Sequence, residues 1–206
     1  MKFYDSITDE AISACAGSLK NGGIVVFPTE TVYGIGVDAF NAQAVEELYK
    51  RKQRPFDKPL LMHIAGIEMA EEIAVLDDNA KKLINKFTPG PLTLVVKRKN
   101  CLPSVAVSNG DTVGLRFPSN EAFLKLSKAF GRPIAATSAN ISGNKSAITP
   151  SELSPVLGIA DDVLNGGECE LGLESTILSL VGDRPRILRQ GSFPRELIEE
   201  CIGKCD

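Results

Sequence analysis

The sequence predicts one α/β domain built on a twisted, mixed parallel and antiparallel sheet with flanking helices. Short apolar runs typical of buried strands alternate with segments whose apolar residues recur at the i, i+3, i+4 spacing of a helix. Proline and glycine separate these segments, and no internal repeat or linker interrupts the 206 residues. A hydrophobic content of 43% is sufficient for a sizeable core. Residues 1–206 are therefore expected to form a single domain.

The first half of the chain predicts three helices and three strands. Thr8 is a suitable N-cap for a helix in which Ile12 and Leu19 lie on one face, and Gly22 follows as a stop signal. Asn41 is the corresponding cap of a second helix, which Pro55 ends. The expected elements are, in order, the helix after Thr8, a strand over 24–27, the helix after Asn41, a strand over 60–64, a helix over 80–87 and a strand over 92–96.

The second half predicts further strands, a hairpin and two helices. Pro118 ends an apolar run over 113–117, and Asn120 is a suitable cap for the helix that follows. Residues 142–155 are rich in Ser, Pro, Asn and Gly, which predicts an exposed, mobile segment. The expected elements are a strand over 113–117, the helix after Asn120, a strand over 134–137, a hairpin of 175–180 with 186–189, and a short helix that holds Leu197, Ile198 and Cys201.

Composition excludes several functional classes. The net charge of −3 argues against non-specific binding of nucleic acid by bulk charge. The five cysteines are odd in number and form no C-x-x-C pair, and there is one histidine, so we expect reduced thiols, no zinc site and a cytoplasmic location. No apolar run approaches the ~20 residues of a membrane span, and the polar residues 1–10 do not resemble a signal peptide.

Two polar patches indicate an anion site. Ser138-Ala139-Asn140 follows the apolar run 134–136, where small hydroxyl and amide residues form a better ligand cradle than a core. Residues 50–58 hold five cations, Lys50, Arg51, Lys52, Arg54 and Lys58, against the single acid Asp57. One interpretation is a clamp that holds a polyphosphate against the polar loop. The other is a solvated helix end, whose cations complement the helix dipole.

Other candidate residues also have two interpretations. Thr29 and Thr31 follow a buried strand and form either a ligand loop or a plain turn. His63 lies in an apolar run, where a lone histidine is either a core residue or a pocket base. Arg116 and Arg189 lie in strand-like runs, where each either needs an anion, from a ligand or from a carboxylate of the chain, or lies at an exposed edge. We find no P-loop, dinucleotide fingerprint or nucleophile elbow.

Several short motifs occur in a fixed order over residues 24–191. They are Pro28 to Gly34, Lys52 to Pro55, Lys58-Pro59-Leu60, Pro89 to Thr93, Arg116-Phe117-Pro118, Ser138 to Gly143, Ser175-Thr176 and Leu188 to Gly191. In this order they resemble the YrdC-like threonylcarbamoyl-AMP synthases. The K-x-R and S-x-N signature of that family is intact at Lys52, Arg54, Ser138 and Asn140.

The resemblance implies a YrdC-like domain with a concave positive face. It implies a nucleotidyltransferase that joins L-threonine, bicarbonate and ATP, with Mg²⁺, into threonylcarbamoyl-AMP and releases pyrophosphate. That product would supply a tRNA-modifying threonylcarbamoyl transferase complex, which forms threonylcarbamoyladenosine in tRNA. The extra C-terminal domain of longer relatives is expected to be absent.

The resemblance also implies a role for each matching residue. Lys52 and Arg54 would be catalytic, and no residue is expected to be a metal ligand. Lys58 replaces an asparagine common in relatives, and Thr137 replaces a proline common before S-x-N. Thr31, His63, Arg116 and Ser175 would bind threonine, and Arg54, Lys58, Thr112, Ser138, Asn140, Ser146 and Arg189 would contact ATP.

Two alternatives stay open beside this enzyme. One is a non-catalytic protein of the same fold that binds double-stranded RNA or tRNA, although the acidic charge balance, three tyrosines and no tryptophan argue against it. The other is a paralogue that uses a different acyl-adenylate or carbamoyl substrate. The preserved threonine-site residues argue against the paralogue.

Overall fold

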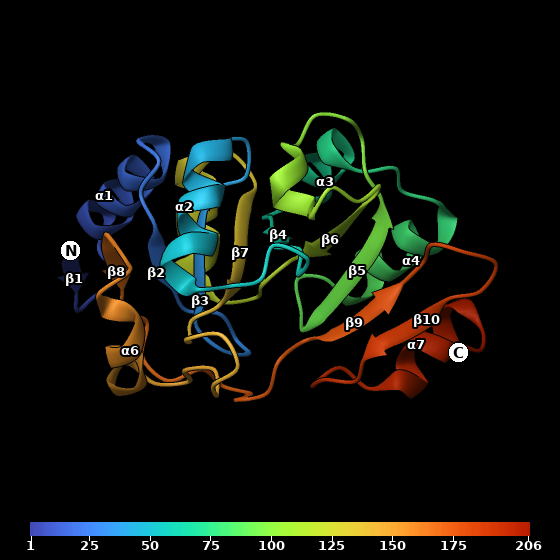
Figure 1. Ribbon diagram of the computed structural model, residues 1–206. Helices are drawn as coiled ribbons and strands as arrows, with labels where there is room; N and C mark the ends of the chain where they lie inside the picture. The colour runs from blue at the N-terminus through green and yellow to red at the C-terminus, as the bar shows by residue number, and fades with distance from the viewer.

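The computed structural model describes residues 1–206 and contains one mixed sheet of ten strands (Figure 1). The strands are β1 Lys2–Tyr4, β2 Val25–Phe27, β3 Gly34–Asp38, β4 Leu61–His63, β5 Leu92–Lys97, β6 Thr112–Arg116, β7 Ile134–Ser138, β8 Asp162–Leu164, β9 Thr176–Ser179 and β10 Arg186–Arg189. Their order in the sheet is β1-β8-β2-β3-β7-β4-β6-β5-β9-β10. Strands β4 and β6 are parallel, as are β5 and β9, whereas β7 is antiparallel to both of its neighbours. The predicted mixed sheet is confirmed.

Three of the helices begin at the caps that the sequence predicts. The side chains of Thr8, Asn41 and Asn120 each accept a backbone N–H from the first turn of their helix. None of the helices has the length and apolar character needed to cross a membrane. The helices are α1 Asp9–Lys20, α2 Ala42–Lys52, α3 Ile67–Ile73, α4 Asp78–Phe87, α5 Glu121–Phe130, α6 Ser154–Leu157 and α7 Arg195–Ile202, with 3₁₀ turns at Ser104–Val107 and Pro150–Leu153.

Helices cover the two faces of the sheet unequally. On one face α1 and α5 enclose a small core in which Leu19, Phe27 and Phe123 are fully buried. On the other face the larger core includes side chains of α2, α3, α4 and α7. Figure 1 shows α1 at the β1–β8 end of the sheet, with α4 and α7 near β5, β9 and β10 at the other end.

Half of the face that carries α1 and α5 has no helix over it. Alternate residues of a strand point to opposite faces. Leu94 and Leu178 are buried on the covered face, whereas their neighbours Val95 and Ile177, together with Leu61, are only half-buried. The half-buried residues of β4, β5 and β9 therefore form the floor of an open hollow.

The structure also contains elements that the sequence did not predict, namely β1, β3, α3 and β8. Strand β3 holds two glycines in five residues, a composition that weakens the strand signal. A Cβ on Gly36 would lie 2.7 Å from the side chains of Ala136 and Ile134, so the close packing of β3 on β7 requires glycine there. The expectation that residues 142–155 are exposed is wrong for Ala147 and Leu153, which are buried, and a capping box of Thr149 and Glu152 starts helical turns within the segment.

Candidate functional site

A cavity of about 450 Å³ lies over the helix-free half of the sheet. That volume is in the range of small-molecule sites. Its lining includes four Lys or Arg residues, Arg54, Lys58, Arg116 and Arg189, but only two carboxylates, Asp57 and Glu174. The balance favours an anionic ligand, as the expected concave positive face requires. The rest of the lining is Thr29, Thr31, Val32, Tyr33, Gly34, Pro59, Leu61, His63, Val95, Ala136, Thr137, Ser138, Ser175, Ile177 and Leu188.

Strand register gathers three of the four expected threonine ligands at one end of the cavity. His63 of β4 pairs with Arg116 of β6, and Arg116 pairs with Thr93 of β5. The Thr93 hydroxyl lies 2.8 Å from the hydroxyl of Ser175, with both residues buried. Residues from three separate strands and the start of a fourth thus converge on one corner.

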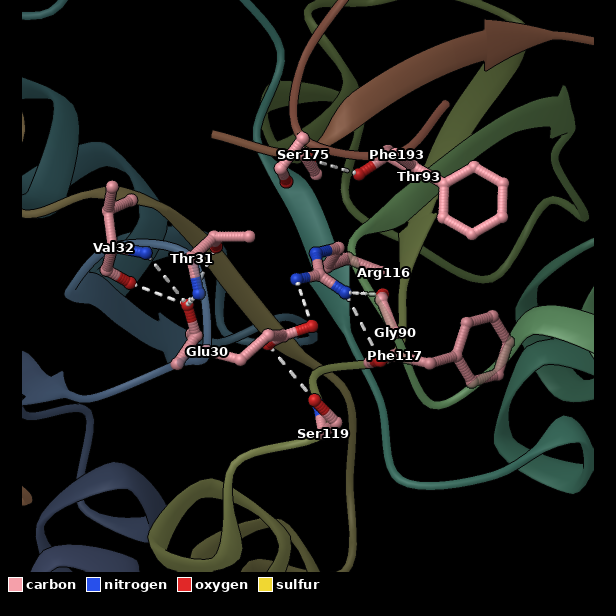
Figure 2. A network of polar contacts seen from close by, with 12 residues as sticks. Glu30, Thr31, Val32, Gly90, Thr93, Arg116, Phe117, Ser119, Ser175 and Phe193 are labelled. Atoms are coloured by element: carbon pink, nitrogen blue, oxygen red, sulfur yellow. Dashed lines mark hydrogen bonds and ion pairs between the residues drawn. The ribbon is translucent and has the colours of Figure 1, made fainter. Parts of the chain in front are cut away.

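Arg116 meets a carboxylate of the chain itself. Its Nη2 donates to Glu30 Oε1 at 2.8 Å, and its Nη1 donates to the carbonyls of Gly90 and Phe117 (Figure 2). Glu30 Oε2 in turn accepts the backbone N–H of Ser119 at 3.3 Å. Burial lowers the pKa of Arg116, and Glu30 opposes that shift. The guanidinium remains charged, because an arginine pKa stays far above neutrality, and its Nε–H takes part in none of these bonds.

His63 is a neutral member of the same corner. Burial, followed by the nearby charge of Arg116, lowers its pKa to about 3. Its ring forms T-shaped pairs with the rings of Phe27 and Phe123 at centroid distances of 5.7 and 5.9 Å. Nδ1 lies 3.3 Å from the Leu61 carbonyl, which can only accept, so Nε2 is left as a hydrogen-bond acceptor. His63 Nε2 can therefore accept a hydrogen bond from a ligand, but the neutral ring cannot form an ion pair with a carboxylate.

The loop after β2, which holds Thr29 and Thr31, forms a hydrogen-bonded turn and also lines the cavity. Thr29 Oγ1 donates to the Val32 carbonyl at 2.6 Å and accepts the backbone N–H groups of Thr31 and Val32. Because the single proton of that hydroxyl is used, the Thr31 hydroxyl donates to it at 2.9 Å and keeps free lone pairs. Thr31 is thus held in the lining as an acceptor.

Lys52 holds the S-x-N loop from outside the cavity lining. Its ammonium donates to the Ser138 carbonyl, to Asn140 Oδ1 at 2.9 Å and to Thr137 Oγ1 at 3.3 Å. The side chain is 1% exposed, and burial together with Arg54 lowers its pKa to about 7. Thr137, which replaces the proline common in relatives, supplies one of the three acceptors for Lys52. A proline side chain could not accept this hydrogen bond. Lys52 and Asn140 form a tie between α2 and this loop, whereas Ser138 lines the cavity.

Arg54 and Lys52 do not converge as two heads of one clamp. Gln53 caps α2 in the left-handed conformation at φ 51°, so the chain turns between them. Arg54 enters the cavity lining, where its Nε and Nη2 donate to the carbonyls of Lys58 and Pro59. The Lys58 ammonium has no ion-pair or hydrogen-bond partner, so both cations can reach a ligand.

Ser146 and Arg189 meet on the carboxylate of Glu174. Ser146 Oγ donates to Glu174 Oε1 at 2.8 Å, and Arg189 Nη1 donates to Glu174 Oε2. Thr112 is not brought into the lining, since it begins β6 opposite Lys97. Gly114, two residues along the same face, pairs with Leu61 of the cavity floor. A ligand would reach Thr112 only by extending past Leu61.

The sequence alone assigned no site role to Glu30, Thr93 and Glu174. The need of Arg116 and Arg189 for anions was the available signal, and a chain carboxylate satisfies each one. No group of three His, Cys, Asp or Glu side chains is arranged to hold a metal ion. The two lining carboxylates fit Mg²⁺ only as an ion whose other ligands come from substrate phosphates and water.

Comparison with known proteins places this arrangement in context. The Sua5/YciO/YrdC family model, described as "Telomere recombination", matches residues 17–191. Threonylcarbamoyl-AMP synthase of Pyrococcus abyssi is 41% identical over 97% of this chain, and that of Bacillus subtilis is 40% identical over 96%. A crystal structure of P. abyssi Sua5 complexed with L-threonine superposes with a TM-score of 0.94 at 40% identity and covers 99% of this chain.

These relatives are longer than the chain. The match spans 59% of the P. abyssi synthase, 58% of the B. subtilis synthase and 60% of the crystallised Sua5 chain. The likeness therefore concerns the part of each relative that corresponds to the sheet and the cavity described above.

Proposed function

The chain belongs to the Sua5/YciO/YrdC family, and we propose that it makes threonylcarbamoyl-AMP from L-threonine, bicarbonate and ATP. The observation that carries the proposal is one cationic cavity lined by two polar groups of residues. One group holds Arg116 and Ser175, and the other holds Arg54, Lys58 and Ser138. The first group suits a small amino acid and the second suits a polyphosphate, so one cavity could hold both ligands.

The chemistry needs two anions to meet. The threonine amine attacks carbon dioxide released from bicarbonate and loses a proton, which gives a carbamate. A carbamate oxygen then attacks the α-phosphorus of ATP, the bond from that phosphorus to the bridging oxygen breaks, and pyrophosphate leaves with the electron pair. Fixed cations that line the cavity would offset the repulsion between the carbamate and the phosphates. Holding both reactants in one cavity would supply much of the remaining acceleration.

The threonine site is assigned from donors and acceptors that remain free. The Arg116 Nε–H faces no partner in the chain and suits the threonine carboxylate. The neutral His63 Nε2 suits a ligand hydroxyl or amine as an acceptor. Thr31 and the Thr93–Ser175 hydroxyl pair complete the corner. The P. abyssi Sua5 structure with L-threonine supports a threonine site in this fold.

The nucleotide site is assigned to the cations and the S-x-N loop. Arg54, Lys58 and Arg189 would contact the phosphates, together with Ser138 and Ser146. Lys52 and Asn140 would keep the loop in place, so Lys52 serves as a positioning residue. Thr112 would contact the nucleoside, because it lies beyond Leu61 along β6. Mg²⁺ carried by the triphosphate would offset the charge on the leaving pyrophosphate.

The proposal extends to the product and its use. The unstable product would pass to a transferase complex that forms threonylcarbamoyladenosine in tRNA. A cytoplasmic location and a single domain over residues 1–206 stay predictions of the sequence. Direct binding of tRNA or double-stranded RNA also stays a prediction.

Pyrophosphate release tests the activity. We expect release from ATP with Mg²⁺ that requires both L-threonine and bicarbonate, and serine in place of threonine should react more slowly. ATP binding without release would favour the paralogue with another substrate. A folded protein that neither binds ATP nor releases pyrophosphate would contradict the proposal and favour the RNA-binding alternative.

A further inference from the structure

Glu174 is a carboxylate placed inside a cavity that suits anions. It lines the cavity, and its side chain is 35% exposed. Oε2 accepts a hydrogen bond from Arg189 Nη1, and Oε1 accepts one from Ser146 Oγ at 2.8 Å. Both carboxylate oxygens are therefore held by the two residues that would contact an ATP phosphate from this side.

The other hydrogen bonds of Arg189 leave a phosphate little access. Nε and Nη2 donate to the Ser175 carbonyl at 3.1 and 2.9 Å, and Nη2 also reaches Ser175 Oγ at 3.3 Å. A guanidinium has five N–H donors, of which one on Nη1 remains free. A phosphate that binds Arg189 through Nη1 must therefore share that atom with Glu174 or displace it.

The backbone around Glu174 is fixed, although its side chain is half-exposed. The Glu174 carbonyl accepts the Ser192 backbone N–H at 2.9 Å and the Ser192 hydroxyl at 3.3 Å. The next residue that is ordered by the sheet is Thr176, whose backbone N–H donates to the Pro91 carbonyl. Rotation of the side chain alone would thus release Arg189 and Ser146 without moving β9 or β10.

We propose that Glu174 is an internal anion that occupies the phosphate subsite of Arg189 and Ser146 in the free protein and is exchanged for a phosphate of the nucleotide. The identity of that nucleotide rests on the proposed function. A single phosphate has to replace two hydrogen bonds of Glu174 and gains few others. A polyphosphate is held by Arg54 and Lys58 as well, so it can displace the carboxylate. Glu174 thereby raises the selectivity of the site for polyphosphates over phosphate.

Isothermal titration with pyrophosphate, inorganic phosphate and ATP in EDTA tests the exchange. EDTA removes any contribution of Glu174 through a bound metal ion. We expect Glu174→Gln to bind pyrophosphate about fivefold more tightly, since the competing half-exposed ion pair is of the order of 1 kcal/mol. Inorganic phosphate should gain more than pyrophosphate, because it lacks the contacts with Arg54 and Lys58 that help pyrophosphate to displace Glu174. General damage to the site would weaken binding instead.

Two further variants identify the contact responsible. Glu170 lies on the same segment, is exposed and has no ion-pair or hydrogen-bond partner, so Glu170→Gln is a charge-matched control that should leave binding unchanged. In an Arg189→Gln background, Glu174→Gln should give no gain. If Arg189→Gln does not fold, Arg189→Lys serves as the background instead, and the gain in pyrophosphate affinity from Glu174→Gln should then be reduced.

The outcomes separate this inference from the proposed function. If the wild-type protein binds pyrophosphate and Glu174→Gln binds it with equal or lower affinity, the inference alone is overturned. A gain that persists without Arg189, or that appears equally in Glu170→Gln, is an effect of net charge and also overturns it. If neither the wild-type protein nor Glu174→Gln binds ATP or pyrophosphate, both the inference and the proposed function are overturned.

Discussion

The guanidinium of Arg116 and the carboxylate of Glu30 lie 2.8 Å apart, with their side chains 2% and 4% exposed. This pair joins β6 to the loop after β2, which are distant in sequence and form adjacent walls of the cavity (Figure 2). Each charge has left water only because the other is present, so neither can be removed alone without cost. The pair fixes the guanidinium, and Nε–H stays available to a ligand.

Glu30→Gln should lower the free energy of unfolding by about 3 kcal/mol, because it leaves the Arg116 charge buried without a counter-charge. It should also raise the KM for threonine more than the KM for ATP, since Arg116 would lose its orientation. Urea unfolding and steady-state kinetics measure the two effects.

The exposed pair of Glu121 and Lys125 has the same 2.8 Å separation and provides the matched control. Glu121→Gln should cost at most about 0.5 kcal/mol, as is usual for surface pairs on a helix. Equal losses in Glu30→Gln and Glu121→Gln would show that burial of the Arg116 pair has no energetic importance.

His63 should remain neutral through the physiological range. Burial and Arg116 lower its pKa to about 3, whereas an unfolded histidine titrates near 6.5. Since His63 is the only histidine, its imidazole NMR signals need no assignment. We expect them to stay unshifted from pH 8 to pH 5. A titration midpoint near 6.5 would contradict the buried, neutral assignment.

The same pKa shift makes stability depend on pH. Below pH 6.5 His63 binds a proton in the unfolded chain but stays neutral in the folded protein. The free energy of unfolding therefore decreases as the pH falls. At pH 5 the loss should reach about 2 kcal/mol relative to pH 7. His63→Gln keeps a hydrogen-bonding side chain without that titration. Its stability should therefore decline less between pH 7 and pH 5 in parallel urea unfolding series.

Local sequence signals predicted α1, α2 and α5 because a cap acts within its own turn. Thr8, Asn41 and Asn120 each lie next to the N–H groups they accept, so no distant residue is needed to recognise them. Strand β3 was not predicted, because Gly34 and Gly36 are required by close packing against neighbouring strands rather than by a local signal. That fit depends on the tertiary structure, which a local pattern does not contain.

The candidate site was predictable as a set of residues but not as a set of contacts. The motifs named Arg116 and Arg189, yet the pairing of each with Glu30 or Glu174 depends on which distant segments the sheet brings together. The clamp interpretation grouped Lys52 and Arg54 as cations that act on one ligand. The left-handed turn at Gln53 instead directs Lys52 into the protein and Arg54 into the cavity.

Lys52 should take up a proton when ATP binds. Burial and Arg54 lower its pKa to about 7, so the side chain is mostly neutral at pH 8 in the free protein. Phosphates bound next to the S-x-N loop favour the ammonium and raise that pKa. Binding at pH 8 should therefore consume about one proton, and binding at pH 6 should consume none at this residue.

Calorimetry in buffers of different ionisation enthalpy counts these protons. Lys52→Met should abolish the uptake at pH 8. Lys50→Met is the matched control, since Lys50 is an exposed residue of the same helix, and it should leave the uptake intact. Uptake that survives in Lys52→Met would assign the proton to another group.

Arg54 and Lys52 should differ when each is replaced by alanine. Arg54 donates only to the carbonyls of Lys58 and Pro59, in an exposed turn where water can replace it. Arg54→Ala should keep the wild-type free energy of unfolding. Its ATP affinity should fall at least tenfold, because a lost charge-assisted hydrogen bond costs about 1.5 kcal/mol. Lys52→Ala should lose about 2 kcal/mol of stability as well, because it removes a buried side chain and its hydrogen bonds to the S-x-N loop. Urea unfolding and ATP titration of the two variants measure these differences. Equal stability losses would mean that the two cations share one role, against the separation that the turn at Gln53 produces.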